Sequence, residues 1–400
     1  MNGRERVEAT LRFEQPDRAP IDLGGMRSTG IHAFALAALR RALGLDERPI
    51  HVYDPEQMLG FPKADLRDRF HVDVVGLEAP GRNPGFALWH RWPLRDDVEL
   101  LLPADVRPER EPDGSWVLRN RAGAVRHRLP TGGFYFDLAD GMMQSSDMPS
   151  VDEYRPGDSY TDEQLDELAA CADILYNETD CAILGSFFGG NLFDLNVGGM
   201  LNWTMLVAAE PERARAYVEK ACDAMIRRAE LAHQAVGGKV FALVIGNDMG
   251  TQRSELYSPD TFRAVNSPAY KRFCEWVHAH TGFRVFLHSC WSIYNYIETL
   301  IDCGIDILNP VQTSAANMEP ERLKAEFGGR IVFWGGGCDT QDVLPHASAE
   351  DVREHVRERM AIFKPGGGFV FNQVHNIQPG CPTENVIAML EAVHDFGAYE

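Results

Sequence analysis

The segment Leu287-His288-Ser289-Cys290 carries the residue types and spacing best suited to chemistry. Residues i and i+2 of a β-strand lie on one face, so His288 and Cys290 are expected to project together. Imidazole and thiolate groups are favoured ligands of zinc. The spacing is short and recurs by chance, so a buried histidine beside an ordinary cysteine is the alternative.

A zinc ion at this position needs a third protein ligand. Cys381 follows the last predicted strand, and Cys338 ends the strand before it. Either thiol is expected near the segment if the ends of the strands meet in space. Three protein ligands with an open fourth position are typical of a catalytic zinc site rather than a structural one.

Further polar residues follow the predicted strands at their carboxyl ends. Asp248 is predicted to act as an acid or base, or to cap the loop after its strand. The residues expected to contact a substrate are Arg27, Asn247, Gln252, Gln312 and Asn376. Active sites of (β/α)8 barrels form at this end of the strands, which is why these residues are grouped.

Short apolar runs alternate with amphipathic stretches along the chain. The strand-length runs are 19–25, 72–78, 182–190, 240–248, 284–290, 307–312, 330–339 and 369–377. Runs rich in Val, Ile, Leu and Phe are typical of buried parallel strands, and helical spacing between them predicts βα units. One long helix is predicted from Pro211 to about Val236.

These runs predict an α/β protein with a closed (β/α)8 TIM barrel. An open doubly wound sheet would carry a G-x-G-x-x-G turn after the first strand, whereas this chain has DLGGMRSTG. Residues from about 85 to 140 break the pattern and predict a β-rich insertion after the second strand, with a hairpin at Asp113–Gly114. We therefore expect one domain over residues 1–400.

Composition excludes several classes of protein. The chain has 400 residues with a formal net charge of −20, which disfavours nucleic-acid and anionic membrane partners. Its apolar runs are shorter than the roughly 18 residues of a membrane helix, and the charged N-terminus lacks a signal peptide. The eight cysteines form no CxxC pair and predict reduced thiols, so we expect a cytoplasmic protein.

Several motifs resemble the uroporphyrinogen decarboxylase-like superfamily. They are ATLRFEQPDRAPIDLGG, GNDMGTQ, FLHSC, DILNPVQTSAANMEPERLKAEFG, VFWGGGCDTQ and GGGFVFNQVHNIQPGCPTENVIAM. The resemblance covers nearly the whole chain and is densest from about residue 240. It implies a (β/α)8 barrel, in agreement with the strand pattern. Trp291 departs from many relatives, which have a small residue there, often glycine.

The resemblance is closest to the zinc-dependent corrinoid methyltransferases. It implies that His288, Cys290 and Cys381 bind Zn²⁺, with Asp248 and His375 lining the pocket. A zinc-bound acceptor thiolate would then take a methyl group from methylcobalamin carried on a partner corrinoid protein. The small-molecule methyl donor or acceptor is unnamed, and a homodimer is one implied oligomeric state.

Two alternatives stay open. A cofactor-free decarboxylase of uroporphyrinogen, or of a related carboxylated substrate, would use Arg27, Asp248 and His375. The resemblance implies a second arginine in the first-strand motif, but Ile31 occupies its position, which weakens this alternative. The third hypothesis is a barrel that binds a corrinoid or tetrapyrrole without catalysis.

Overall fold

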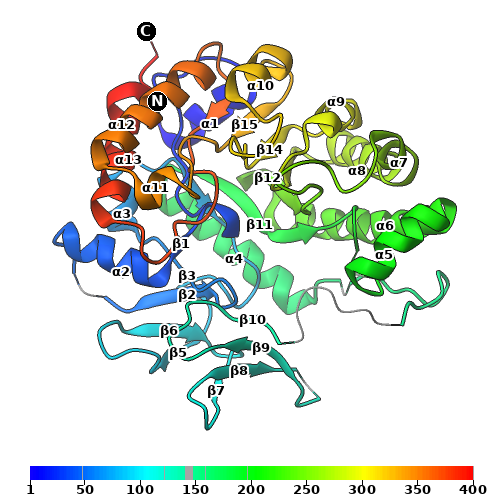
Figure 1. Ribbon diagram of the computed structural model, residues 1–400, viewed down its shortest axis with the longest axis horizontal. Coiled ribbons are helices and arrows are strands. Elements are labelled where there is room, and N and C mark those ends of the chain that lie inside the picture. Colours follow the sequence, from blue (N-terminus) through cyan, green and yellow to red (C-terminus); the bar gives the residue numbers. More distant parts are fainter. Residues whose placement is uncertain (47, 121, 140–146, 158, 196, 400) are drawn as a thin grey trace.

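A computed structural model describes residues 1–46, 48–120, 122–139, 147–157, 159–195 and 197–399. A seven-stranded parallel sheet forms its centre (Figure 1). Its strands, in spatial order, are β4 (Val74–Gly76), β11 (Ala182–Gly190), β12 (Val240–Gly246), β13 (Arg284–His288), β14 (Ile307–Asn309), β15 (Val332–Trp334) and β16 (Phe369–Val370). Spatial order follows chain order, as a barrel of βα units requires.

The first predicted strand closes this sheet into a barrel. Ile21 forms a parallel bridge with Phe371, next to β16. On the opposite side, the Asp73 amide, one residue before β4, donates to the Ile21 carbonyl at 2.8 Å. Residues around Ile21 therefore hydrogen-bond to both edges of the seven-stranded sheet. The predicted parallel α/β sheet is confirmed at seven of the eight predicted strand positions, and at the first, 19–25, the structure has an isolated bridge at Ile21 in place of a strand.

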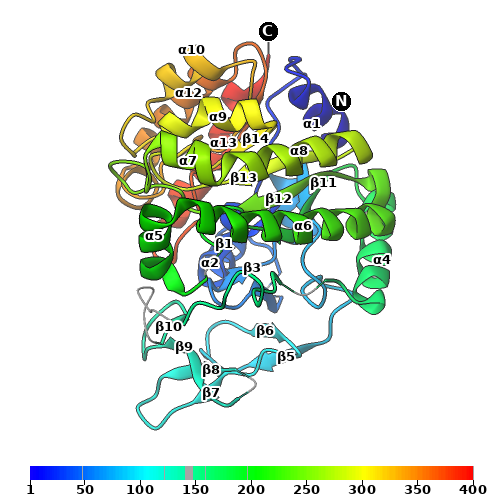
Figure 2. The same cartoon turned by 90° about the vertical axis from the view of Figure 1, so that its right-hand side faces the viewer.

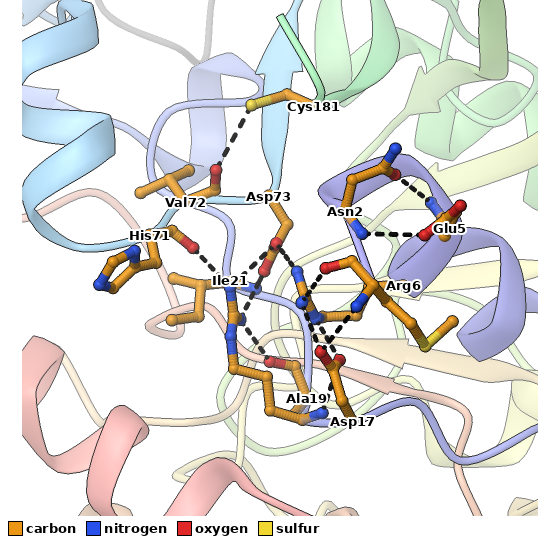
Figure 3. A network of polar contacts seen from close by, with 12 residues as sticks. Asn2, Glu5, Arg6, Asp17, Ala19, Ile21, His71, Val72, Asp73 and Cys181 are labelled. Atoms are coloured by element: carbon orange, nitrogen blue, oxygen red, sulfur yellow. Dashed lines mark hydrogen bonds and ion pairs between the residues drawn. The ribbon is translucent and has the colours of Figure 1, made fainter.

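A buried carboxylate strengthens this closure at the amino-terminal end of the strands (Figure 3). Asp73 accepts hydrogen bonds from Arg6 at 2.5 Å, from Arg18 at 2.6 Å and from the Ile21 amide at 2.8 Å. Arg6 also pairs with Asp17. This network lies at the amino-terminal end of β4. Active sites of such barrels form at the carboxyl ends of the strands, so we interpret the network as structural.

Helices surround the sheet, and Figure 2 shows α6 and α8 side by side across its outer face. Those that follow barrel strands are α4 (Asp162–Glu178), α5 (Gly199–Ala209), α6 (Pro211–Val236), α7 (Pro259–Val265), α8 (Ser267–His280), α9 (Tyr294–Cys303), α10 (Pro320–Phe327), α11 (Val343–His346), α12 (Ala349–Phe363) and α13 (Thr383–Gly397). The helix predicted from Pro211 is confirmed at both ends. None of the described helices is both long and apolar enough to span a membrane.

The remaining helices, α1 (Gly3–Leu11), α2 (Ala33–Ala42) and α3 (Ala64–Arg69), belong to the N-terminal part of the chain, which also has the short 3-10 turn η1 (Arg27–Thr29). A second 3-10 turn, η2 (Gly237–Lys239), joins α6 to β12. The two chain ends meet, because the Tyr399 amide donates to the Asp17 carbonyl.

Apolar side chains pack in two layers, inside the barrel and between its strands and helices. Along β13, Val285 and Leu287 pack in the outer layer, whereas Phe286 packs in the inner one with Trp334. Strand alternation then directs His288 inward, on the same face as Phe286. The sequence of β13 therefore places its last residue in the mouth of the barrel.

Two small sheets lie beside the barrel, below it in Figure 1. One contains β1 (Ile31–His32), β3 (Leu59–Gly60), β2 (Ile50–Asp54), β6 (Leu100–Pro103) and β5 (Trp89–Trp92), and the other β10 (Asp137–Leu138), β9 (Val125–Leu129), β8 (Trp116–Arg119) and β7 (Glu109–Arg110). Strands thus occur within the predicted 85–140 segment, of which residues 121 and 140 lie outside the described residues, and Asp113 and Gly114 join β7 to β8. That the segment is an insertion stays a prediction. The strands β1–β3 were not predicted.

Candidate functional site

A pocket with a volume of about 530 Å³ opens at the carboxyl ends of the barrel strands. Polar side chains in its wall include those of Arg27, Ser28, Asn247, Asp248, His288 and His375. They come from the segments that follow the first, fourth, fifth and eighth barrel strands. The grouping of strand-end residues predicted from the sequence is therefore present for these positions.

His288, Cys290 and His375 form a compact group at this pocket. One ligand atom from each residue lies within 4.8 Å of the others, and Cys290 Sγ lies 3.5 Å from His288 Nε2. Atoms bound to one zinc ion at 2.0–2.3 Å in tetrahedral geometry lie roughly 3.3–3.8 Å apart. The group therefore needs only small movements to hold a metal ion.

Asn309 determines which nitrogen of His288 is available to a metal. The Asn309 amide nitrogen donates to the Trp334 carbonyl at 2.8 Å, which identifies its Oδ1 as the free acceptor. This oxygen lies 2.7 Å from His288 Nδ1, so Nδ1 carries the proton. The lone pair of Nε2 then faces Cys290, and such second-shell contacts are usual at metal-bound histidines.

The protonation states of the group suit a cation. Burial lowers the pKa of His288, and burial is also the main cause that lowers the pKa of His375 to about 4. Both rings are thus neutral at pH 7 and have a lone pair to donate. Burial, with the negative charge of Asp248, raises the pKa of the Cys290 thiol well above its usual value. A bound cation would reverse that effect and favour the thiolate.

Asp248 contacts this group directly. Its Oδ1 atom accepts from the Cys290 amide at 3.0 Å and lies 3.9 Å from His288 Nε2. The side-chain oxygen of neighbouring Asn247 accepts a hydrogen bond from the side-chain amide of Asn191 at 2.8 Å. The carboxylate thus orients the turn that carries Cys290 and places a negative charge beside the pocket.

Arg27 lies in the pocket wall and pairs with Asp54 at 2.8 Å. Its side chain is half exposed, so the guanidinium reaches the pocket while Asp54 orients it. Ser28, the next residue, places its hydroxyl 3.4 Å from His288 Nε2.

Three predicted substrate-binding residues hold loops and do not line this pocket. Gln312 accepts from the Trp291 amide and donates to Gln252, which in turn donates to the Ser314 carbonyl. Asn376 accepts from the Gly30 amide at 2.9 Å. Any contact of Gln252, Gln312 or Asn376 with a substrate stays a prediction, whereas their role in shaping the mouth follows from these hydrogen bonds.

Among the described residues, the compact group contains neither Cys381 nor Cys338. Cys381 lies beyond the loop that carries His375, just before α13, and its backbone amide donates to the Gln378 carbonyl. The expectation that one of these thiols lies against His288 and Cys290 is therefore not met in the geometry, and His375 takes that place.

Sequence reasoning missed several residues around the site. Asn309 ends β14 and Glu78 follows β4, whereas Ser186 lies in the middle of β11. For Asn309 and Glu78 the available signal was their position at strand ends, the same signal that selected Asp248.

Comparison with known families agrees with this architecture. The sequence profile of the uroporphyrinogen decarboxylase (URO-D) family matches residues 144–396, which is more than half of the chain. The chain therefore belongs to the uroporphyrinogen decarboxylase family.

Individual relatives are more distant. A uroporphyrinogen decarboxylase of Methylococcus capsulatus is 32% identical over 101 residues, 25% of this chain and 27% of that protein. One of Anaeromyxobacter dehalogenans is 24% identical over 208 residues, 50% of this chain and 54% of that protein. The matches thus span about a quarter to a half of these relatives. A solved methyltransferase from Methanosarcina mazei has the same fold, with a TM-score of 0.59, 16% identity and 99% coverage of both chains.

Proposed function

We propose that this protein is a zinc-dependent methyltransferase that exchanges a methyl group between a corrinoid carrier protein and a small-molecule acceptor or donor, such as a thiol. The observation that carries the proposal is the compact group of His288, Cys290 and His375 in the mouth of the barrel. The similarity of fold to a methyltransferase of Methanosarcina mazei supports the choice of reaction.

The three side chains fit zinc in ligand type, spacing and protonation. Zinc, when bound, would act as a Lewis acid that lowers the pKa of a coordinated thiol and makes it nucleophilic at neutral pH. His288, Cys290 and His375 would hold the ion and leave a fourth position open to the pocket. Asn309 keeps the Nε2 lone pair of His288 available to the ion.

The other wall residues would act on the substrate. Asp248 holds the Cys290 turn and adds negative charge, which favours a bound cation. Arg27, oriented by Asp54, offers its remaining hydrogen-bond donors to a polar part of a substrate. A methylated corrinoid would have to approach from solvent over the mouth, so the proposed partner is a separate corrinoid protein.

One observation supports a second candidate, a decarboxylase of uroporphyrinogen or a related acid. Arg27, Asp248 and His375 line one pocket, and that reaction needs no metal. However, Ile31 is an apolar residue, fully buried in β1, so this position supplies no positive charge to the mouth. A poly-anionic tetrapyrrole would therefore meet little cationic surface here, which favours the methyltransferase.

The test begins with metal content and proceeds to methyl transfer. Protein purified without chelators is analysed for zinc, and methylcobalamin consumption is followed by absorbance under anaerobic conditions with 2-mercaptoethanol as acceptor. We expect about one zinc per chain, and methyl transfer that Cys290→Ala abolishes. Cys181→Ala is the matched control, since that thiol donates to the Val72 carbonyl near Asp73, at the end of the strands opposite the mouth.

The outcomes separate the three hypotheses. Zinc with methyl transfer supports the methyltransferase. A metal-free protein that decarboxylates uroporphyrinogen would select the decarboxylase. Binding of methylcobalamin without turnover of either substrate would leave a non-catalytic binding barrel.

A further inference from the structure

A second cavity of about 320 Å³ adjoins the pocket of the metal-binding group. The two cavities share Arg27, Ser186 and Gly189 in their walls, so they form neighbouring compartments of one mouth. We refer to the second cavity as the side compartment. Its other wall residues include Tyr53, Glu78 and Phe187.

Two buried polar groups of the side compartment have an unfilled hydrogen bond. Glu78 is 6% exposed and Tyr53 is 3% exposed. Ser186 donates to Glu78 Oε2 at 3.0 Å, but Glu78 Oε1 and the Tyr53 hydroxyl have no hydrogen-bond partner among the described residues. A buried polar group without a partner costs stability, so its persistence calls for an explanation such as a ligand.

Local structure holds these two groups in place. The Glu78 amide donates to Asn83 at 2.9 Å, and Asn83 donates back to the Glu78 carbonyl. A Cβ atom at Gly76 would lie 2.6 Å from Glu78 Oε1, and one at Gly30 would lie 3.1 Å from the Tyr53 hydroxyl. Glycine at these two positions therefore leaves room for the carboxyl and phenol groups.

The charges of the side compartment favour an uncharged ligand group. Its arginines are already paired, Arg27 with Asp54 and Arg82 with Asp105, so they offer little to a further anion. Burial raises the pKa of Glu78 to about 8, so its carboxyl is largely neutral at pH 7 and attracts a cation weakly. A neutral carboxyl and a phenol each donate and accept hydrogen bonds, as an alcohol does.

We propose that the side compartment is a recognition subsite that binds an uncharged hydroxyl group of the substrate, with Glu78 and Tyr53 as its hydrogen-bonding residues. The apolar face of Phe187 would contact the carbon skeleton beside that hydroxyl. The assignment rests on the proposed function in one respect, because it takes the adjoining pocket to hold the reacting end of the same molecule. Glu78 and Tyr53 then determine specificity rather than the chemical step.

The test measures binding to metal-free protein with three probes of equal ring size. Dissociation constants of cyclohexanol, cyclohexane and cyclohexanecarboxylate are determined by ligand-observed NMR. We expect cyclohexanol to bind about tenfold or more tightly than the other two, since each new hydrogen bond contributes severalfold in affinity. Tyr53→Phe should reduce this preference about fivefold, and Glu78→Leu should reduce it at least as much.

Glu56→Gln is the matched control, because Glu56 lies on the exposed rim of the same compartment. It should leave the preference for cyclohexanol unchanged. Equal affinities for the three probes, or a preference that survives in Tyr53→Phe, would overturn the assignment. If Glu78→Leu does not fold, Tyr53→Phe alone decides, since it removes a single hydroxyl. These binding constants need no zinc, so failure of the methyltransferase proposal would be seen separately as missing metal or methyl transfer.

Discussion

His288 Nδ1 and Asn309 Oδ1 lie 2.7 Å apart, at the ends of two neighbouring parallel strands. The pair places a proton on Nδ1 and thereby leaves Nε2 free to bind a metal. Register makes this contact possible, since His288 of β13 is paired with Asn309 of β14. The geometry of the sheet thus determines the tautomer of a residue in the pocket.

Replacing Asn309 should weaken metal binding without removing a ligand. In Asn309→Ala the His288 ring loses the acceptor that orients it, and we expect zinc affinity to fall by about 10–100-fold. Competition with a chromophoric chelator measures the change. Asn177→Ala, an exposed residue of α4, is the control and should bind zinc as the wild type does. Unchanged affinity in Asn309→Ala would show that the ring needs no such support.

The third ligand can be identified by two single substitutions. His375→Ala should lose most of its bound zinc, because His375 lies within the compact group. Cys381→Ala should keep about one zinc per chain. Elemental analysis of both variants decides between the two residues, and the opposite pattern would show that the loop before α13 rearranges when metal binds.

Seven of the barrel strands were predictable because each contains a short apolar run, such as Val240–Ile245 in β12 and Val285–Leu287 in β13. The residue that lies beside His288 and Cys290 was harder to predict. Residue type favoured the thiol of Cys381, whereas the path of the loop after β16 brings the imidazole of His375 into the pocket. Spacing in a sequence specifies side-chain direction within a strand, but it does not specify how far a loop reaches. The structure therefore brings His288 and Cys290 together as the strand spacing predicts, whereas a role of Cys381 in binding zinc stays a prediction.

The strands β1–β3 were missed for a different reason. They are two to five residues long, and Ile50 pairs with Leu100, far along the chain. Short strands of this kind depend on distant partners rather than on local propensity. These strands matter for the site, since β2 supplies Tyr53 and Asp54.

Asp73 should contribute strongly to stability. Asp73→Ala leaves Arg6 buried without this partner and removes the acceptor of the Ile21 amide, so we expect a loss of about 3–5 kcal/mol. Urea unfolding followed by circular dichroism measures it. Asp17→Ala is the comparison, because this carboxylate is 46% exposed and its loss should cost roughly 1 kcal/mol or less. Similar values for both variants would contradict the structural role given to Asp73.

Glu78 should make stability depend on pH. Burial raises its pKa from 4.5 to about 8, so the folded state binds the proton more tightly than the unfolded state. The stabilisation is complete below about pH 4.5 and is lost as the pH rises toward 8, by at most about 1.4 kcal/mol per pH unit. Glu78→Gln lacks this dependence and should gain stability relative to the wild type between pH 5 and pH 8. If the free energies of unfolding of the wild type and of Glu78→Gln changed in parallel with pH over that range, Glu78 would have an ordinary pKa in the folded protein.

Closure of the barrel through Ile21 has a consequence for how the chain folds. The segment that contains Ile21 leaves the ribosome some 350 residues before its bridging partner, Phe371. One flank of that segment therefore stays unpaired during most of translation, and contacts so distant in the chain slow folding. An unpaired strand edge of this kind is open to aggregation, so we expect nascent chains of this protein to depend on chaperones until the last strand emerges.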